Sequence, residues 1–250
     1  TFDHVTFRYP GMEHPALDDV SFTVKPGTIV GLVGPSGGGK STAAAMIPRF
    51  WDVQSGSVKI GGVDVRQMDS RDLMSRVAFV FQDTKLFKTS ILENIRMARP
   101  KATIEEVKAA AKAARCDDIL EKLPRGLDTV GGTQGVYLSG GEAQRIALAR
   151  AILKDAPIIV LDEASAFADP ENEALIQKAF EELTKDKTVL MIAHRLSTIR
   201  NANDILVMEK GKLAEWGSHE ELLAKGGLYA DMWKDYQQAA AWKVGKEEMI

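Results

Sequence analysis

The sequence has little cysteine and no long apolar run. Cys116 is the one cysteine, so no internal disulfide can form, a cysteine-built metal site is excluded, and a reducing compartment is the simplest interpretation. No uninterrupted apolar stretch approaches the roughly 18–20 residues that span a bilayer, and no signal peptide is visible. The formal net charge is -3 over 250 residues, which gives no indication of a nucleic-acid-binding surface.

Apolar residues follow strand and helix periods in turn along the chain. Residues 1–32 predict short strands separated by Pro-Gly turns, and residues 89–154 show helical periodicity. Buried-strand patterns follow at Ile158–Leu161 and Thr188–Ala193, with a predicted helix between them that starts at Asp169-Pro170. A helix is also predicted over Ser41–Phe50. This alternation predicts an α/β core with a parallel sheet and a mostly helical insert.

A glycine-rich run lies between a buried strand and a helix and reads Gly34-Pro35-Ser36-Gly37-Gly38-Gly39-Lys40-Ser41. Glycines let a backbone curl around phosphate with its N–H groups pointing inward. The spacing predicts that Lys40 reaches the outer phosphates and Ser41 places its hydroxyl on Mg²⁺, and we include Thr42 among the nucleotide-binding residues. The alternative is a chance glycine-rich turn, which occurs in about 1 in 100 chains of this length.

A predicted buried strand ends in two acids, Asp162 and Glu163. Asp162 is placed to hold Mg²⁺ through water, and Glu163 could orient and deprotonate a water that attacks the γ-phosphate. A helix cap or a solvated turn is the alternative, and the glycine loop disfavours it. Together the two motifs predict ATP hydrolysis.

The run Leu138-Ser139-Gly140-Gly141-Glu142 precedes a predicted helix with Gln144 and Arg145. It resembles the signature motif of ATP-binding cassette (ABC) proteins, which usually reads Leu-Ser-Gly-Gly-Gln. In that family the Ser-Gly-Gly turn contacts the γ-phosphate of ATP on a second cassette, so the resemblance implies this role for Ser139, Gly140, Gly141 and Glu142. An ordinary helix N-cap is the alternative for a lone Ser-Gly-Gly.

The resemblance runs from about residue 1 to residue 236 and implies further roles. Tyr9 matches the aromatic that stacks on adenine, and Gln82 matches the Q-loop glutamine that contacts Mg²⁺ and the water and senses the membrane domain. His194 matches the switch histidine that contacts the γ-phosphate, and Asp169 matches the D-loop aspartate that communicates across the dimer. On their own, these residues are more typical of strand packing, strand ends or helix caps.

The family implies a P-loop NTPase (RecA-like) fold with an antiparallel β subdomain. We expect the ATP-binding core and β subdomain at residues 1–82 and 156–250, and the helical signature subdomain at 83–155. The chain begins at Thr1 rather than Met, so we expect a piece of a longer polypeptide, with a transmembrane domain upstream.

The segment from Gln82 to Ile95 looks like the exporter branch of the family, and residues 128–135 resemble the exporter X-loop. Three features depart from the pattern: Glu142 replaces Gln, Gly132 replaces Glu, and residues 165–169 read Ser-Ala-Phe-Ala-Asp. The last run, with Pro170-Glu171-Asn172-Glu173, resembles a bacterial subgroup with exporter architecture that takes up iron-siderophores. The direction of transport is set outside this domain.

The resulting hypothesis is a motor domain that dimerises around ATP and Mg²⁺ and drives transport at the cytoplasmic face of the cell membrane. Its expected partners are a second cassette, in a homodimer or a heterodimer, and the transmembrane domain, without nucleic acid. A non-transport ABC ATPase and a regulatory cassette that binds ATP without hydrolysing it remain alternatives. The signature motif disfavours a generic P-loop kinase or GTPase.

Overall fold

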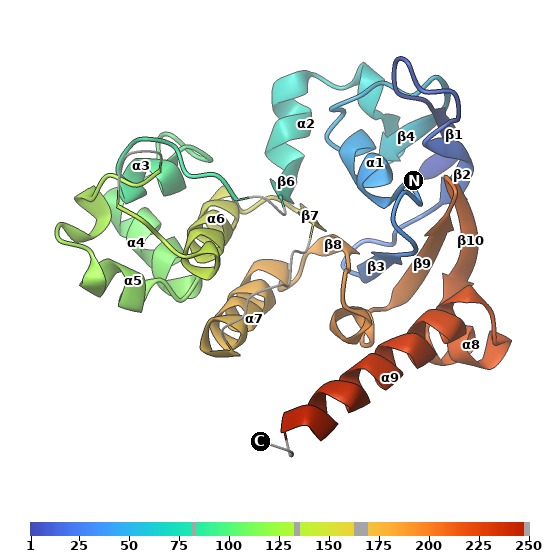
Figure 1. The fold of residues 1–250 in the computed structure, drawn as a ribbon. Coiled ribbons are helices and arrows are strands. Elements are labelled where there is room, and N and C mark those ends of the chain that lie inside the picture. The colour runs from blue at the N-terminus through green and yellow to red at the C-terminus, as the bar shows by residue number, and fades with distance from the viewer. Residues whose placement is uncertain (82–83, 133–135, 163–169, 248–250) are drawn as a thin grey trace. The chain divides into compact units, whose positions relative to one another are not determined.

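The computed structural model describes residues 1–81, 84–132, 136–162 and 170–247, and Figure 1 labels its elements. The chain folds as two compact units: Thr1–Leu73 with Leu190–Ile250, and Met74–Val189. Residues 83–155, where we expected the helical subdomain, lie inside the second unit, which also takes in strands and a helix on either side.

The first unit carries the β-rich part of the chain. Its elements are β1 (Phe2–Phe7), β2 (Leu17–Phe22), β3 (Ile29–Val33), α1 (Lys40–Met46), β4 (Ser55–Ile60), β5 (Val63–Asp64), the 3₁₀ turns η1 (Val65–Gln67) and η3 (Leu196–Ile199), β9 (Asp204–Glu209), β10 (Lys212–Gly217), α8 (His219–Lys225) and α9 (Leu228–Glu247). Two further elements cross the boundary between the units: α2 (Ser70–Arg76) and β8 (Thr188–Ile192).

A four-stranded antiparallel sheet with the order β2-β1-β4-β5 forms one layer of this unit. The β1–β2 register opposes Phe2 to Phe22, Val5 to Val20 and Phe7 to Leu17, and all six side chains are buried. The rings of Phe2 and Phe22 stack at 4.4 Å between centroids. Register and burial agree because a slip of one residue would turn these side chains towards solvent.

The second layer of the first unit has the strand order β10-β9-β3-β8. Strand β3 pairs in parallel with β9, and β9 forms an antiparallel hairpin with β10. Residues 30–33 and 205–208 are buried, as expected for parallel strands that are covered on both faces. The carboxyl end of β3 leads directly into the glycine run.

The second unit combines two parallel strands with a group of helices. Its elements are β6 (Val77–Val80), α3 (Ile91–Arg96), α4 (Ile104–Ala113), α5 (Asp117–Lys122), the 3₁₀ turn η2 (Gly126–Asp128), α6 (Gly140–Lys154), β7 (Ile158–Asp162) and α7 (Pro170–Thr184). Strand β6 pairs with β7, and the order continues from β7 to the start of β8. Helices α3, α4 and α7 each pack against α6 (Figure 1).

These elements confirm the predicted α/β class with a parallel sheet. The strands predicted within residues 1–32 and at Ile158–Leu161 and Thr188–Ala193 lie within a few residues of the observed ones. Helix α1 is shorter than expected and ends at Met46 rather than Phe50. Arg49 has a φ of 58°, in the left-handed region, so the backbone cannot continue an α-helix there.

Helix-terminal polar groups and one buried amide organise the helical part of the second unit. Thr103 and Glu106 form a capping box at the start of α4. Asn94 is fully buried on α3, and its side chain bonds both the N–H (2.8 Å) and the carbonyl (3.0 Å) of Phe87. It also donates to the carbonyl oxygens of Thr89 and Ser90. A single side chain therefore fixes the loop from Phe87 to Ser90 against α3.

Replacing Asn94 by alanine should lower the free energy of unfolding by about 2–4 kcal/mol, because buried backbone groups would lose their partners. Urea denaturation of the chain measures this change. Glu93→Ala is the matched control, since Glu93 is exposed and its ion pair with Arg96 should contribute less than about 1 kcal/mol. Equal stability of Asn94→Ala and the control would contradict the role assigned to the amide.

Candidate nucleotide-binding site

The glycine run forms a tight loop between β3 and α1 in the first unit. Helix α1 begins at Lys40, after Gly39, whose φ of 99° lies in the left-handed region, and no side chain caps the helix. Gly34 at the other end of the loop has a φ of 139°. A side chain at either position would be strained, so the loop conformation requires glycine there.

Close packing against the backbone gives a second reason for glycine in the loop. A Cβ atom on Gly34 would lie 1.9 Å from the carbonyl oxygen of Met208, and one on Gly39 would lie 2.5 Å from the carbonyl oxygen of Ala16. Neither backbone neighbour can move aside like a flexible side chain. The backbone of the loop therefore packs directly against the backbone at Met208 and Ala16, with no side chain between them.

The turn between β9 and β10 supports the loop from behind. Gly211 donates its N–H to the carbonyl of Gly38 at 3.1 Å and accepts at its own carbonyl from the N–H of Asp18 at 2.8 Å. Lys210 and Gly211 form this turn with φ values of 49° and 79°. The sequence predicts strands on either side of Lys210-Gly211, and nothing in its pattern links this turn to the glycine run.

Lys40 folds back over its own loop. Its ammonium donates to the carbonyl oxygens of Gly34 and Pro35, both at 2.8 Å. A phosphate at the centre of the loop would compete for these donors, since a charge-assisted bond to an anion is stronger than one to a neutral carbonyl. The ammonium is thus close to the position at which the sequence predicts it to act.

A pocket of about 590 Å³ opens over the loop, within the size range of ligand sites. Its lining brings together most of the nucleotide-binding residues predicted in this unit. They are Tyr9, Gly34, Ser36, Gly37, Gly38, Gly39, Lys40, Ser41 and Thr42, and His194, the predicted switch histidine, lines the same pocket. Met12, His14, Pro15, Ala16, Ala193, Leu196 and Met232 also line the pocket, and sequence reasoning did not find them because they carry no motif.

Tyr9 is held at this pocket by its ring and by its hydroxyl. The hydroxyl lies 3.1 Å from that of Thr42, and either group can donate. The ring meets Phe7 at 4.9 Å and Trp51 at 5.3 Å between centroids, with planes 85° and 89° apart. These contacts orient the ring at the pocket; its predicted stacking on adenine stays a prediction.

The other predicted site residues belong to the second unit. Asp162 ends β7 and is half-buried. Gln82, Glu163 and Asp169 lie outside the described residues, as do residues 165–168. Ser139 is the N-cap of α6 and forms a capping box with Glu142, while Gly140 and Gly141 form the first turn of that helix.

The chemistry of the predicted ligands fits ATP with Mg²⁺. The loop offers backbone N–H groups and one ammonium to phosphate. A Cβ atom on Gly34 or Gly39 would clash with neighbouring carbonyl oxygens and prevent the loop from taking this path. The hydroxyl of Ser41 and the carboxylate of Asp162 are oxygen ligands, which Mg²⁺ prefers. In the described part of the chain no three His, Cys, Asp or Glu side chains gather to form a metal site of their own. Mg²⁺ typically binds through one or two protein groups and substrate phosphates.

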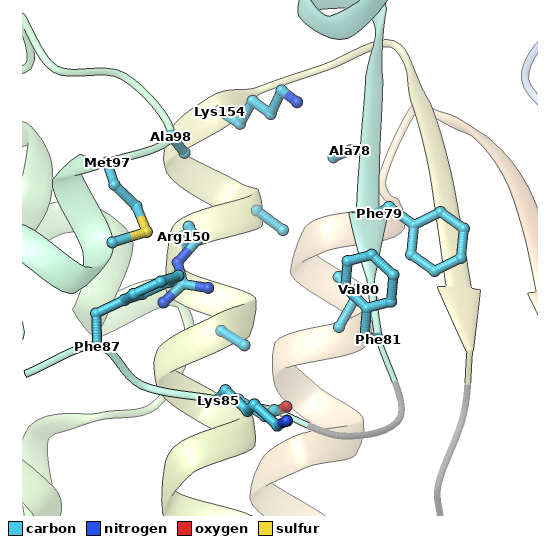
Figure 2. A pocket seen from close by; sticks show the side chains of 13 residues that line it. Ala78, Phe79, Val80, Phe81, Lys85, Phe87, Met97, Ala98, Arg150 and Lys154 are labelled. Atoms are coloured by element: carbon cyan, nitrogen blue, oxygen red, sulfur yellow. The ribbon is translucent and has the colours of Figure 1, made fainter. Parts of the chain in front are cut away.

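A second pocket of about 460 Å³ lies within the second unit (Figure 2). Phe79, Val80 and Phe81 line it from β6 and its end, and Arg150 and Lys154 line it from α6. Burial lowers the pKa of Arg150 and of Lys154. The remaining lining residues are Ala78, Thr84, Lys85, Phe87, Met97, Ala98, Ala147 and Ala151.

Two cations of this pocket, Arg150 and Lys154, are fixed by backbone carbonyls. Arg150 donates from Nε to the carbonyl of Asn94 at 2.7 Å, and its guanidinium lies 6.0 Å from the centre of the Phe87 ring. Lys154 donates to the carbonyl of Val77 at 2.7 Å. The exposed rings of Phe81 and Phe87 make the mouth apolar. Sequence reasoning did not predict this pocket, because its residues share no motif.

None of the described helices is long and apolar enough to cross a membrane. The buried Cys116 thiol has its pKa raised to about 12, chiefly by burial, so it stays protonated at neutral pH.

The sequence of this chain is similar to those of known ABC proteins. The sequence pattern of the ABC transporter family matches residues 17–166. The mycobactin import ATP-binding/permease protein IrtA of Mycobacterium tuberculosis is 52% identical over 233 residues, which cover 93% of this chain and 27% of IrtA. The ATP-dependent lipid A-core flippase of Methylobacillus flagellatus is 50% identical over 234 residues, covering 93% of this chain and 40% of the flippase.

A solved structure of a protein from the same family has a similar fold. A bacterial Atm1-family ABC exporter with ATP bound has a TM-score of 0.87 and 43% identity, over 94% of this chain and 41% of that chain. The chain thus spans less than half the length of each of these three relatives.

Replacing Lys40 by alanine should weaken ATP binding by roughly 10- to 100-fold, because a charge-assisted hydrogen bond to phosphate is lost. Equilibrium binding of a fluorescent ATP analogue measures the change. Lys25→Ala serves as the control, since Lys25 is an exposed lysine of the same unit that does not line the pocket. Unaltered binding by the Lys40 variant would show that the loop is not the phosphate site.

Proposed function

The chain belongs to the ABC transporter family, and on that premise we propose that it is the cassette that binds and hydrolyses ATP to drive substrate across a membrane. The observation that carries this proposal is the pocket over the glycine loop. It gathers Tyr9, Lys40, Ser41, Thr42 and His194 from separate parts of one unit.

In this proposal the nucleotide lies along the pocket. Tyr9 stacks on the adenine, and the backbone from Gly34 to Gly39 surrounds the phosphates. The ammonium of Lys40 leaves the carbonyl oxygens of Gly34 and Pro35 for the outer phosphate oxygens. Thr42 adds its hydroxyl at the start of α1, beside Tyr9.

Ser41 and Gln82 would hold Mg²⁺ with their side-chain oxygen atoms, and Asp162 would hold it through water. When bound, the ion would supply positive charge that stabilises the phosphate oxygens. Glu163 orients and deprotonates the attacking water, and His194 contacts the γ-phosphate. Gln82 and Glu163 lie outside the described residues, so their assignments depend on the family resemblance.

The signature turn completes a site on another cassette. Two cassettes close head to tail, and Ser139, Gly140 and Gly141 of each contact the nucleotide held by its partner, with Asp169 communicating across the interface. Support comes from the position of Ser139 at the N-cap of a long helix, where backbone N–H groups face outward. Release of phosphate then reopens the dimer.

We propose that the second pocket, lined by Phe79 of β6 and Arg150 of α6, receives the cytoplasmic ends of the transmembrane helices. Its apolar mouth suits a short amphipathic segment, and Gln82 follows Phe81 directly in sequence. Movement of the chain at Gln82 when the nucleotide site closes would be transmitted to the membrane domain through the segment bound in this pocket. The cassette would then lie at the cytoplasmic face of the cell membrane.

The cargo depends on parts of the protein beyond this chain. The run from Ser165 to Glu173 favours an iron-siderophore as cargo, and one relative is named for mycobactin import. Another relative of similar identity is named as a lipid A-core flippase. Reconstitution of the full-length protein into liposomes separates a transporter from a non-transport ATPase, because only a transporter moves substrate.

The central test of hydrolysis replaces Glu163 by glutamine, which keeps the shape of the side chain but removes the base. We expect ATP turnover to fall by about 100-fold or more, the contribution typical of general-base catalysis. The variant should also accumulate as an ATP-bound dimer, seen by light scattering after size exclusion.

Glu182→Gln is the matched control, because Glu182 is an exposed carboxylate on α7. It should hydrolyse ATP at the rate of the unaltered chain and form no stable dimer. Turnover by Glu163→Gln at that same rate would refute the role of Glu163 as the base.

A further inference from the structure

A carboxylate lies at the helix terminus that the proposed function assigns to the partner's nucleotide. Ser139 accepts at its hydroxyl from the N–H of Glu142 at 3.2 Å, and Glu142 accepts from the N–H of Ser139 at 2.9 Å. A glutamine amide oxygen at position 142 could accept the same bond. The glutamate therefore adds a negative charge to the signature turn without changing its capping.

A lysine from a neighbouring helix faces this carboxylate. The ammonium of Lys122, at the end of α5, lies 3.9 Å from Glu142 and 3.9 Å from Asp118. The Glu142 side chain is 18% exposed and that of Lys122 is 70% exposed. The negative charge is thus largely covered, while the balancing positive charge stays open to solvent.

A buried arginine fixes the helix that carries Lys122. Arg145 of α6 is 1% exposed and binds Asp118 of α5 through two bonds of 2.6 and 2.9 Å. It also donates to the carbonyl of Arg115 and, at 2.9 Å, to Asn172 of α7. The Arg145 guanidinium lowers the pKa of Asp118, so this ion pair persists well below neutral pH. Arg145 is therefore a positioning residue for α5.

The four charged groups that these ion pairs join balance one another. Glu142 and Asp118 are negative, and Lys122 and Arg145 are positive, so their formal sum is zero. Loss of the lysine charge would leave a net negative terminus, and loss of the glutamate charge a net positive one. Because an incoming γ-phosphate is an anion, these two changes should act on its binding in opposite directions.

We propose that Glu142 and Lys122 form a charge-compensated pair that sets how strongly the Ser139–Gly141 turn binds the γ-phosphate of the nucleotide on a second copy of this chain. The inference depends on the proposed function, in which this turn completes the partner's site. Glu142 weakens the anion site, and Lys122 restores it. The strength of closure around ATP is thereby set by a pair of residues outside the nucleotide pocket.

The test compares Glu142→Gln, Lys122→Met and the double variant, each in the Glu163→Gln chain, where closed dimers should accumulate. The measurement is the ATP concentration that gives half-maximal dimer at low ionic strength. We expect this concentration to fall about three-fold for Glu142→Gln and to rise about three-fold for Lys122→Met, with both shifts shrinking as salt is added. The double variant should return to the starting value.

Two controls separate this charge effect from a structural one. Lys108→Met removes an exposed lysine from α4 and should leave the concentration unchanged. Binding of a fluorescent ATP analogue to the monomer should be the same for all variants, because the pair serves the partner's nucleotide. If the pair only held α5 to α6, both single variants would weaken dimer formation and the double would not recover.

The outcomes also separate this inference from the proposed function. If the Glu163→Gln chain forms no ATP-dependent dimer, the proposed function itself fails. If that dimer forms but Glu142→Gln and Lys122→Met leave its ATP dependence unmoved, or shift it in the same direction, the charge-compensated pair is refuted alone.

Discussion

The nucleotide pocket depends on one close contact, in which the main chain at Gly34 lies against the carbonyl of Met208. A Cβ atom at Gly34 would lie only 1.9 Å from that oxygen, so the loop can take this path only without a side chain. Gly211 then supports the loop through the carbonyl of Gly38. The curvature that presents N–H groups to phosphate is therefore imposed by β9 and its turn as much as by the glycines themselves.

Each unit of the chain carries an incomplete set of groups for the reaction. The first unit carries the pocket lined by Tyr9, Lys40 and the glycine loop, while the signature turn at Ser139 lies at the start of a helix of the second unit. In the proposed function, that turn acts on the nucleotide of another copy. Such a division would make hydrolysis depend on association, which a free-standing ATPase does not need.

Sequence reasoning succeeded where chemistry requires a fixed spacing. The strand-loop-helix around Lys40 and the start of a helix after Ser139 could be located because glycine, lysine and serine occur in set order. The contact of Gly211 with the glycine loop, the lining residue Met232 and the pocket beside Arg150 could not be predicted, because long-range packing brings these residues into place. Helix α1 was predicted too long since its apolar pattern continues past the residue where the backbone turns left-handed.

The central claim is that one copy of the chain completes the nucleotide site of another. The most direct measurement is the ATP hydrolysis rate per chain as the protein concentration is varied at saturating Mg-ATP. If two copies form the active site, the rate per chain rises with concentration and levels off once the dimer predominates. A rate per chain that is measurable and constant from the lowest concentration upward, with the chain monomeric throughout, would contradict the account.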